Sequence, residues 1–199
     1  MTDPLKHSKA NIAAAGRALE SMIGAKSFDI YEHEWREFLG HIEKAWIKAE
    51  RACVPFQEKF QPWQGKYVKL RRKDMLLSYL KAARDVDNHS IQDLAKMNPG
   101  YTGMNFIDRR GGFIEKLVIG PSGQIVEYRG DPLVVTEVPP LPVALRVKNN
   151  GQWYEPPTSH LGQPLTDMHP TKLATLGLEF YKAFLAEVER IFFPQSSPQ

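Results

Sequence analysis

The chain contains very little cysteine and no long apolar run. Its single cysteine, Cys53, excludes an internal disulfide and a cysteine-rich zinc site, and it fits a reducing compartment. No apolar stretch approaches the roughly 20 residues of a membrane-spanning helix. The first residues also lack the charged-then-apolar layout of a signal peptide. We therefore expect a cytoplasmic protein that does not use a membrane.

The composition is that of a soluble globular protein, with 42% hydrophobic and 25% charged residues. The length of 199 residues suits one domain with a sizeable insertion. The net charge of +3 is modest, but its distribution is uneven. From Lys59 to Arg84 every charged residue is basic except Asp74. Such a stretch predicts a nucleic-acid-binding patch, and the alternative is a solvated helix surface with acidic neighbours folded over it.

Apolar residues at helical spacing predict three helices in the first half of the chain. The first helix is expected to stop at Gly24. The second helix is expected to begin with a cap at Asp29 and to end at Pro55. Residues 55–68 read as an aromatic-rich connection that covers the end of a bundle or, alternatively, stacks nucleic-acid bases. The third helix is predicted from about residue 72 to residue 96.

A fourth helix is predicted between Pro170 and Pro194, which bracket a wide apolar stripe. Between the third and fourth helices, short β-type runs and an Asn150-Gly151 turn predict a small antiparallel meander. The expected fold is α+β: an up-and-down four-helix bundle with the meander inserted between the third and fourth helices. The predicted parts are the first three helices (1–99), the inserted β subdomain and loop (100–168), the fourth bundle helix (169–193) and a disordered tail (194–199).

The sharpest chemical motif lies late in the third predicted helix, in Arg84-Asp85-Val86-Asp87-Asn88-His89. An arginine and a nearby histidine can serve phosphodiester chemistry without a metal. At about 100° per residue, Arg84 and His89 lie roughly 140° apart around a helix, so one helix does not aim both at the same point. Asp85 and His89 do share a face, as do Arg84 and Asn88. Convergence needs long side chains or a second copy of the helix across a dimer axis.

With this motif in a helical bundle, the chain resembles the HEPN superfamily. Its members are mostly four-helix bundles, and many are metal-independent ribonucleases of toxin and defence systems. Their signature is an arginine, four to six residues and a histidine, often with a polar residue directly after the arginine. Arg84, Asp85 and His89 match that signature. The resemblance covers roughly residues 8–97 and 170–193, and the β insertion has no counterpart in it.

The resemblance implies an endoribonuclease in which the RNA 2′-hydroxyl attacks the adjacent phosphate, leaving a 2′,3′-cyclic phosphate and requiring no metal or cofactor. His89 would act as general base or acid, Arg84 would stabilise the phosphate charge and Asp85 would orient His89. The expected substrate-binding residues are Asn88, Lys81, Arg72 and Lys73. The implied partners are RNA, a second copy of the chain in a homodimer, and a cognate antitoxin or regulator.

A noncatalytic HEPN-like interaction or regulatory module is the competing hypothesis. In that case Arg84 and His89 belong to an ordinary helix surface with intrahelical ion pairs. Asp87 and Asp93 support this alternative, because their charge opposes RNA binding unless they point away.

Other histidines offer weaker hypotheses. His33 and His41 share a helix face with Glu37, but their eight-residue separation does not match a metalloprotease motif, and a solvated polar face is favoured. His160 and His169 lie in a predicted loop without a nucleophile motif.

Overall fold

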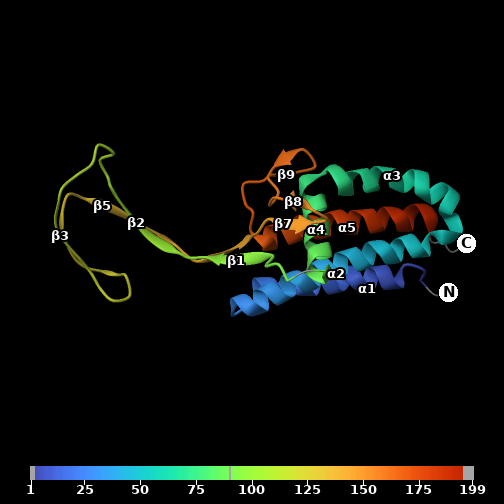
Figure 1. The fold of residues 1–199 in the computed structure, drawn as a ribbon, viewed down its shortest axis with the longest axis horizontal. Helices are drawn as coiled ribbons and strands as arrows, with labels where there is room; N and C mark the ends of the chain where they lie inside the picture. The colour runs from blue at the N-terminus through green and yellow to red at the C-terminus, as the bar shows by residue number, and fades with distance from the viewer. Residues whose placement is uncertain (1–2, 90, 195–199) are drawn as a thin grey trace, which may run out of the picture. The chain divides into compact units, whose positions relative to one another are not determined.

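The computed structural model describes residues 3–89 and 91–194, and the side chains of residues 88 and 89 lie outside this description (Figure 1). The chain divides into two compact units. The first, termed here the helical unit, comprises Met1–Lys96 and Pro142–Gln199. The second, termed the β unit, comprises Met97–Leu141. The expected α+β class is confirmed by the helices and small antiparallel hairpins described below.

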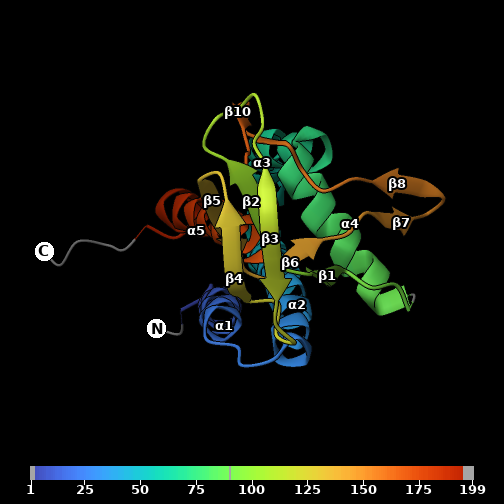
Figure 2. The same cartoon turned by 90° about the vertical axis from the view of Figure 1, so that its left-hand side faces the viewer.

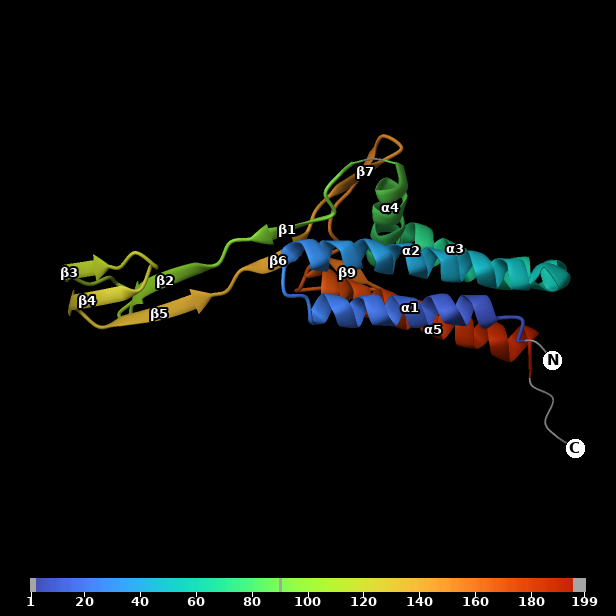
Figure 3. The ribbon, with the colours of Figure 1, turned by 90° about the horizontal axis from the view of Figure 1, so that it is seen from below.

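The described part of the helical unit has five α-helices, and α5 packs against α1 and α2. Their bounds are α1 Lys6–Ile23, α2 Phe28–Ala52, α3 Gln57–Lys73, α4 Met75–His89 and α5 Pro170–Phe192, with a short 3-10 helix at Val54–Phe56. Figures 1 and 3 show α1, α2, α3 and α5 running lengthwise, with α4 crossing them. Among the helices of residues 3–89 and 91–194, none carries the long apolar stretch that a membrane span requires.

The predicted ends of several helices are confirmed. α1 ends just before Gly24, and Pro170 occupies the first position of α5. The predicted cap of α2 is wrong by two residues, because Ser27 is the N-cap and its side chain accepts a hydrogen bond from the Ile30 N–H at 3.3 Å. Asp29 lies in the first turn instead, where a negative charge still favours the helix dipole.

The predicted connection at residues 55–68 is wrong, because helix α3 occupies most of it. Its buried face repeats at helical spacing, although two of its members are polar: Phe60, Gln64, Tyr67 and Arg71. The aromatic side chains of this helix pack on α5. The ring centroids of Tyr67 and Phe184 lie 5.0 Å apart. This packing outweighs the loss of about 3 kcal/mol expected for the proline inside the helix, Pro62.

The predicted third helix, residues 72–96, is also wrong in its extent. Asp74 interrupts it: its N–H makes the last helical bond, to the Leu70 carbonyl, and its extended backbone, with ψ of 132°, then ends α3. Its Oδ1 then accepts a hydrogen bond from the Leu77 N–H at 3.0 Å and caps the start of α4. After His89 the chain leaves the helix, and a strand begins at Ala95. One aspartate therefore turns the motif-bearing segment into a separate helix.

The core of the helical unit includes a buried ion pair. Arg71 was expected in the surface basic stretch, but only 7% of it is exposed. Its Nη2 donates to Glu43, and its Nε donates to the Tyr181 hydroxyl at 3.0 Å. The guanidinium carbon lies 4.2 Å from the centroid of the Trp46 ring. This arginine therefore joins α2, α3 and α5 inside the bundle and is unavailable to a phosphate.

The strands form two-stranded antiparallel pairs in place of the single predicted meander. Their bounds are β1 Ala95–Asn98, β2 Tyr101–Phe106, β3 Ile114–Ile119, β4 Ile125–Gly130, β5 Leu133–Val138, β6 Leu141–Ala144, β7 Val147–Asn149, β8 Gln152–Tyr154, β9 Ser159–His160 and β10 Gln163–Pro164. β3 pairs with β4, and β2 pairs with β5 (Figure 2). β4 and β5 do not continue one sheet, because Asp131 between them bonds back to Phe113 and closes the β3–β4 hairpin. The predicted Asn150-Gly151 turn is confirmed, with φ of 48° and 82° between β7 and β8.

Candidate functional site

The end of α4 gathers three of the predicted site residues into one polar network. The Lys81 Nζ donates to the Asp85 Oδ2 at 2.7 Å, and the Arg84 Nη1 donates to the Asp85 Oδ1 at 3.2 Å. A fourth group comes from β7: the Asn149 Nδ2 donates to the Asp85 Oδ2 at 3.3 Å. The Asp85 carboxylate therefore holds two cations of its own helix and ties that helix to the β7–β8 hairpin.

This network keeps Asp85 ionised. Burial of the carboxyl opposes its ionisation, but the hydrogen bonds and positive charges of Lys81 and Arg84 outweigh burial and lower the pKa of Asp85. Its negative charge is therefore compensated locally.

Asp87 faces a different partner from Asp85. The Arg36 Nη1 of α2 donates to the Asp87 Oδ1 at 2.6 Å, and the Arg36 Nη2 donates to Glu32 at 2.8 Å and to the Gln92 carbonyl at 3.2 Å. The expectation that Asp87 adds repulsive charge at the site is weakened, because Arg36 compensates it. Asp93 is exposed.

The β7–β8 hairpin is fixed beside the segment that follows α4. The Gln92 Nε2 donates to the Lys148 carbonyl at 3.1 Å, and the Lys148 N–H donates back to the Gln92 Oε1 at 3.0 Å. On this hairpin Trp153 is 48% exposed. The Arg146 guanidinium carbon lies 4.5 Å from the centroid of its ring, and the Lys148 Nζ lies 5.7 Å from it. An exposed aromatic ring with adjacent cations is a surface on which a nucleic-acid base can stack.

Sequence reasoning identified the hairpin turn but missed this group. The signal in the sequence was a pair of basic residues, Arg146 and Lys148, before the Asn-Gly turn and an aromatic residue, Trp153, after it. The pairing of Gln92 with Lys148 and of Asp85 with Asn149, respectively 56 and 64 residues apart, leaves no local pattern.

The remaining predicted site residues are not all brought to this end of α4. Arg72 and Lys73 are exposed at the end of α3. Arg84 lies nine residues into α4, roughly 14 Å along the helix axis from its start. The side chains of Asn88 and His89 lie outside the described residues, so their assigned roles remain predictions.

Asp74 and His160 form a second, buried acid–histidine pair. The His160 Nδ1 lies 2.9 Å from the Asp74 Oδ1, and the Leu161 N–H donates to the Asp74 Oδ2 at 2.6 Å. Burial opposes ionisation of Asp74, but these bonds and the cap at Leu77 lower its pKa. The pair holds the β9–β10 turn, where Leu161 adopts a φ of +48°, against the start of α4. This geometry indicates a structural clamp.

His169 and His41 also bond within the fold. The N–H of Thr171 donates to the Nδ1 of His169 at 3.3 Å, so His169 caps α5. The His41 Nδ1 lies 3.2 Å from the Asn11 Oδ1, and its Nε2 lies 3.6 Å from Glu37. Across residues 3–89 and 91–194, no three His, Cys, Asp or Glu residues form a group that could hold a metal ion.

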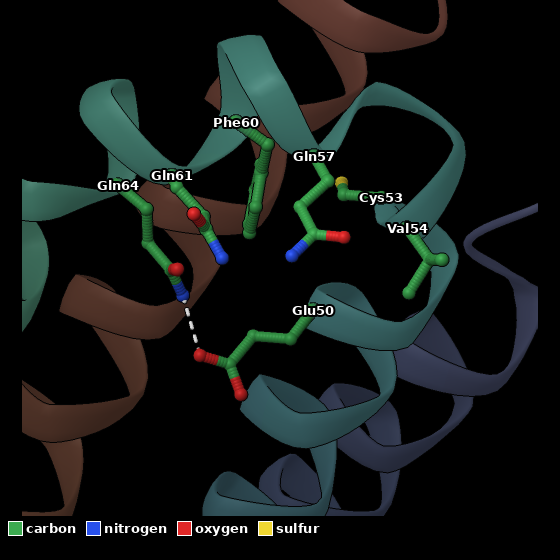
Figure 4. A pocket seen from close by; sticks show the side chains of 7 residues that line it. All are labelled: Glu50, Cys53, Val54, Gln57, Phe60, Gln61 and Gln64. Atoms are coloured by element: carbon green, nitrogen blue, oxygen red, sulfur yellow. Dashed lines mark hydrogen bonds between the residues drawn. The ribbon is translucent and has the colours of Figure 1, made fainter.

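Figure 4 shows a pocket of about 220 Å³ between the end of α2 and the start of α3. The Gln64 Nε2 donates across it to the Glu50 Oε1 at 2.7 Å. Burial raises the pKa of the Cys53 thiol to about 11, which keeps it protonated and weakly nucleophilic. The lining residues are Glu50, Cys53, Val54, Gln57, Phe60, Gln61 and Gln64. This set contains no base paired with a nucleophile, so the pocket does not form a catalytic site.

No protein-family model, curated protein or solved structure matches the chain. The function proposed below therefore depends on the residues of this chain and on the resemblance of its motif.

Proposed function

We propose that the chain is a HEPN-like, metal-independent endoribonuclease with its site at the end of α4. One observation carries the proposal: on the helix that carries the motif, Asp85 joins Lys81, Arg84 and Asn149 into a single network. In the proposal the cations supply the charge and His89 the proton transfer that RNA cleavage requires.

In this proposal the ribose 2′-oxygen attacks the adjacent phosphorus, and the bond from phosphorus to the 5′-oxygen breaks. His89 takes the proton from the 2′-hydroxyl or gives one to the leaving 5′-oxygen. Arg84 donates from its planar guanidinium to the non-bridging oxygens as negative charge develops on them. The products are a 2′,3′-cyclic phosphate and a 5′-hydroxyl.

Asp85 acts as a positioning residue in this scheme. It holds Arg84 and Lys81 in place through the bonds described above, in addition to the orienting role toward His89 that the family resemblance implies. Asn88 and Lys81 contact the phosphate or ribose. Arg72 and Lys73, at the end of α3 just before α4 begins, would contact a more distant part of the RNA backbone.

The β7–β8 hairpin gives the substrate class. A base stacked on Trp153, with Arg146 and Lys148 near its phosphates, requires an unpaired strand. We therefore propose single-stranded or looped RNA as the substrate.

The HEPN-like identity of the bundle belongs to the same proposal, together with a homodimer that brings two copies of the α4 motif into one cleft. A cytoplasmic role with a cognate antitoxin or regulator completes it. α4 crosses the lengthwise helices, and this arrangement departs from a simple up-and-down bundle.

The test is incubation of end-labelled structured and unstructured RNAs with purified protein in excess EDTA. We expect cleavage by the wild type and its loss in Arg84→Ala and in His89→Ala. His33→Ala and Arg51→Ala are matched controls, because both residues are exposed on α2, and they should cleave normally. Cleavage that persists in both motif variants would contradict the proposal.

A noncatalytic HEPN-like interaction module is the second candidate. It is favoured by the exposed apolar side chains of the β unit, described in the next subsection, which suit a binding surface. A well-folded wild type that binds a partner but cleaves none of the RNAs would support this alternative.

A further inference from the structure

The β unit has no core of its own. None of residues 97–141, all of which the structure describes, is buried. Eleven of its large apolar side chains are 37% to 67% exposed, and the others are half-buried. The exposed ones are Met97, Tyr101, Ile107, Phe113, Ile114, Val118, Ile119, Val126, Val134, Val135 and Leu141. A two-stranded hairpin without a packed face is marginally stable in water, so this unit needs a partner surface.

Apolar side chains occupy both faces of these hairpins. Neighbouring residues of a strand point to opposite faces. Val134 and Val135 are consecutive in β5, whose pairing with β2 is regular, and both are exposed. A hairpin with one solvated face would alternate apolar and polar residues instead. The pattern is that of strands covered on both sides.

The strand edges are open as well. β2, β3, β4 and β5 each pair with a single neighbour, so each has one edge without a strand partner. Open apolar edges join other chains unless they are covered or blocked by charge. β5, which reads Leu-Val-Val-Thr-Glu-Val, carries only one charged residue.

We propose that the β unit is a self-association surface whose occupant is the β unit of a second copy of the chain. Residues 97–141 contain four basic and five acidic residues, so two copies would not repel each other. The same balance disfavours a nucleic-acid backbone, which requires excess positive charge. The exposed apolar side chains offer on the order of 1,000 Å² per copy, against roughly 800 Å² per partner in a stable interface.

A two-fold dimer uses the same patch on both copies. In such a dimer the two β units would cover apolar faces of each other and pair their open edges. The proposal makes the β unit the interface of the homodimer that the proposed function includes, and in that respect it rests on that function. The molecular mass tests this interface, whereas cleavage by Arg84→Ala tests the ribonuclease separately.

The test measures the mass of the full chain by size-exclusion chromatography with light scattering. We expect twice the 22.7 kDa of one chain. The double variant Val126→Lys/Val135→Lys changes one exposed residue in each hairpin and should elute as a single chain. Ile23→Lys, the same kind of change at an exposed residue of α1, should remain a dimer.

Hydrogen exchange of the wild type provides a second measurement that needs no variant. Amides of β3 and β5 should be protected at high protein concentration and should lose protection on dilution, whereas amides of α2 should not change. A wild type that is monomeric at all concentrations would overturn the proposal, including the case of a different protein as occupant. A dimer that persists in the double variant would also overturn it and move the interface elsewhere, for example to the groove between α1 and α5.

Discussion

Replacing Arg71 with methionine should destabilise the helical unit by about 3–5 kcal/mol, the cost of leaving a buried charge without its partner. The Glu43 side chain is 10% exposed, so water cannot replace the arginine. The Tyr181 hydroxyl loses its donor as well. Methionine keeps an apolar stem against Trp46, which separates the loss of the ion pair from a loss of packing. For a chain of this length the expected fall in Tm is about 6–20 °C.

The assay is urea unfolding followed by tryptophan fluorescence, with the double variant Arg71→Met/Glu43→Leu alongside. Removing both charges should recover stability to within about 1–2 kcal/mol of the wild type, because no unpaired buried charge remains. Arg72→Met changes the exposed neighbouring arginine and should alter the free energy of unfolding by less than about 0.5 kcal/mol. A loss below about 1 kcal/mol for Arg71→Met, or a double variant no more stable than the single one, would refute this reasoning.

Two further variants test other parts of the fold. Burial lowers the pKa of His169 below its usual 6.5, so the unfolded chain is protonated at this residue before the folded chain as the pH falls. The free energy of unfolding should therefore decrease as the pH drops below 6.5. His169→Asn keeps a capping side chain without titrating, and urea midpoints at pH 7.5 and 5.5 should differ less in it than in the wild type. A Cβ at Gly177 would lie 2.5 Å from the buried Leu80 Cδ1, so Gly177→Ala should cost about 1–3 kcal/mol in a thermal melt. Gly16→Ala, whose Cβ would meet nothing closer than 4.0 Å, should be neutral or stabilising, and equal effects of both alanines would contradict the close approach of α4 and α5.

The apolar periodicity of the sequence was enough to predict α1, α2 and α5. Each has a continuous apolar stripe and clear terminal signals, such as Gly24 and Pro170. The Asn150-Gly151 hairpin was equally predictable, because few residue pairs adopt two consecutive positive φ angles.

α3 was missed because its sequence signals conflict. Pro62 and Gly65 are typical of a connection, and the buried stripe includes the polar Gln64 and Arg71. Only packing against α5 and the ion pair with Glu43 make this stripe an interior face. The break at Asp74 had a local signal, a capping residue directly before an apolar run.

The candidate site was predictable only in part. The motif was enough to predict Arg84 and Asp85 as site residues, because they are adjacent in the sequence. The contact between Asp85 and Asn149 and the position of Trp153 near α4 depend on how the hairpin folds back, which no spacing along the chain encodes.

The most direct test of the ribonuclease proposal is the dependence of cleavage on the 2′-hydroxyl. A short single-stranded RNA with one mapped cleavage position is compared with the same strand carrying a single 2′-deoxynucleotide there, in excess EDTA. Our account predicts a 2′,3′-cyclic phosphate end from the first strand and no cleavage at that position in the second. Cleavage of the 2′-deoxy position, or a linear 3′-phosphate formed directly, would contradict attack by the 2′-oxygen and with it the proposed function.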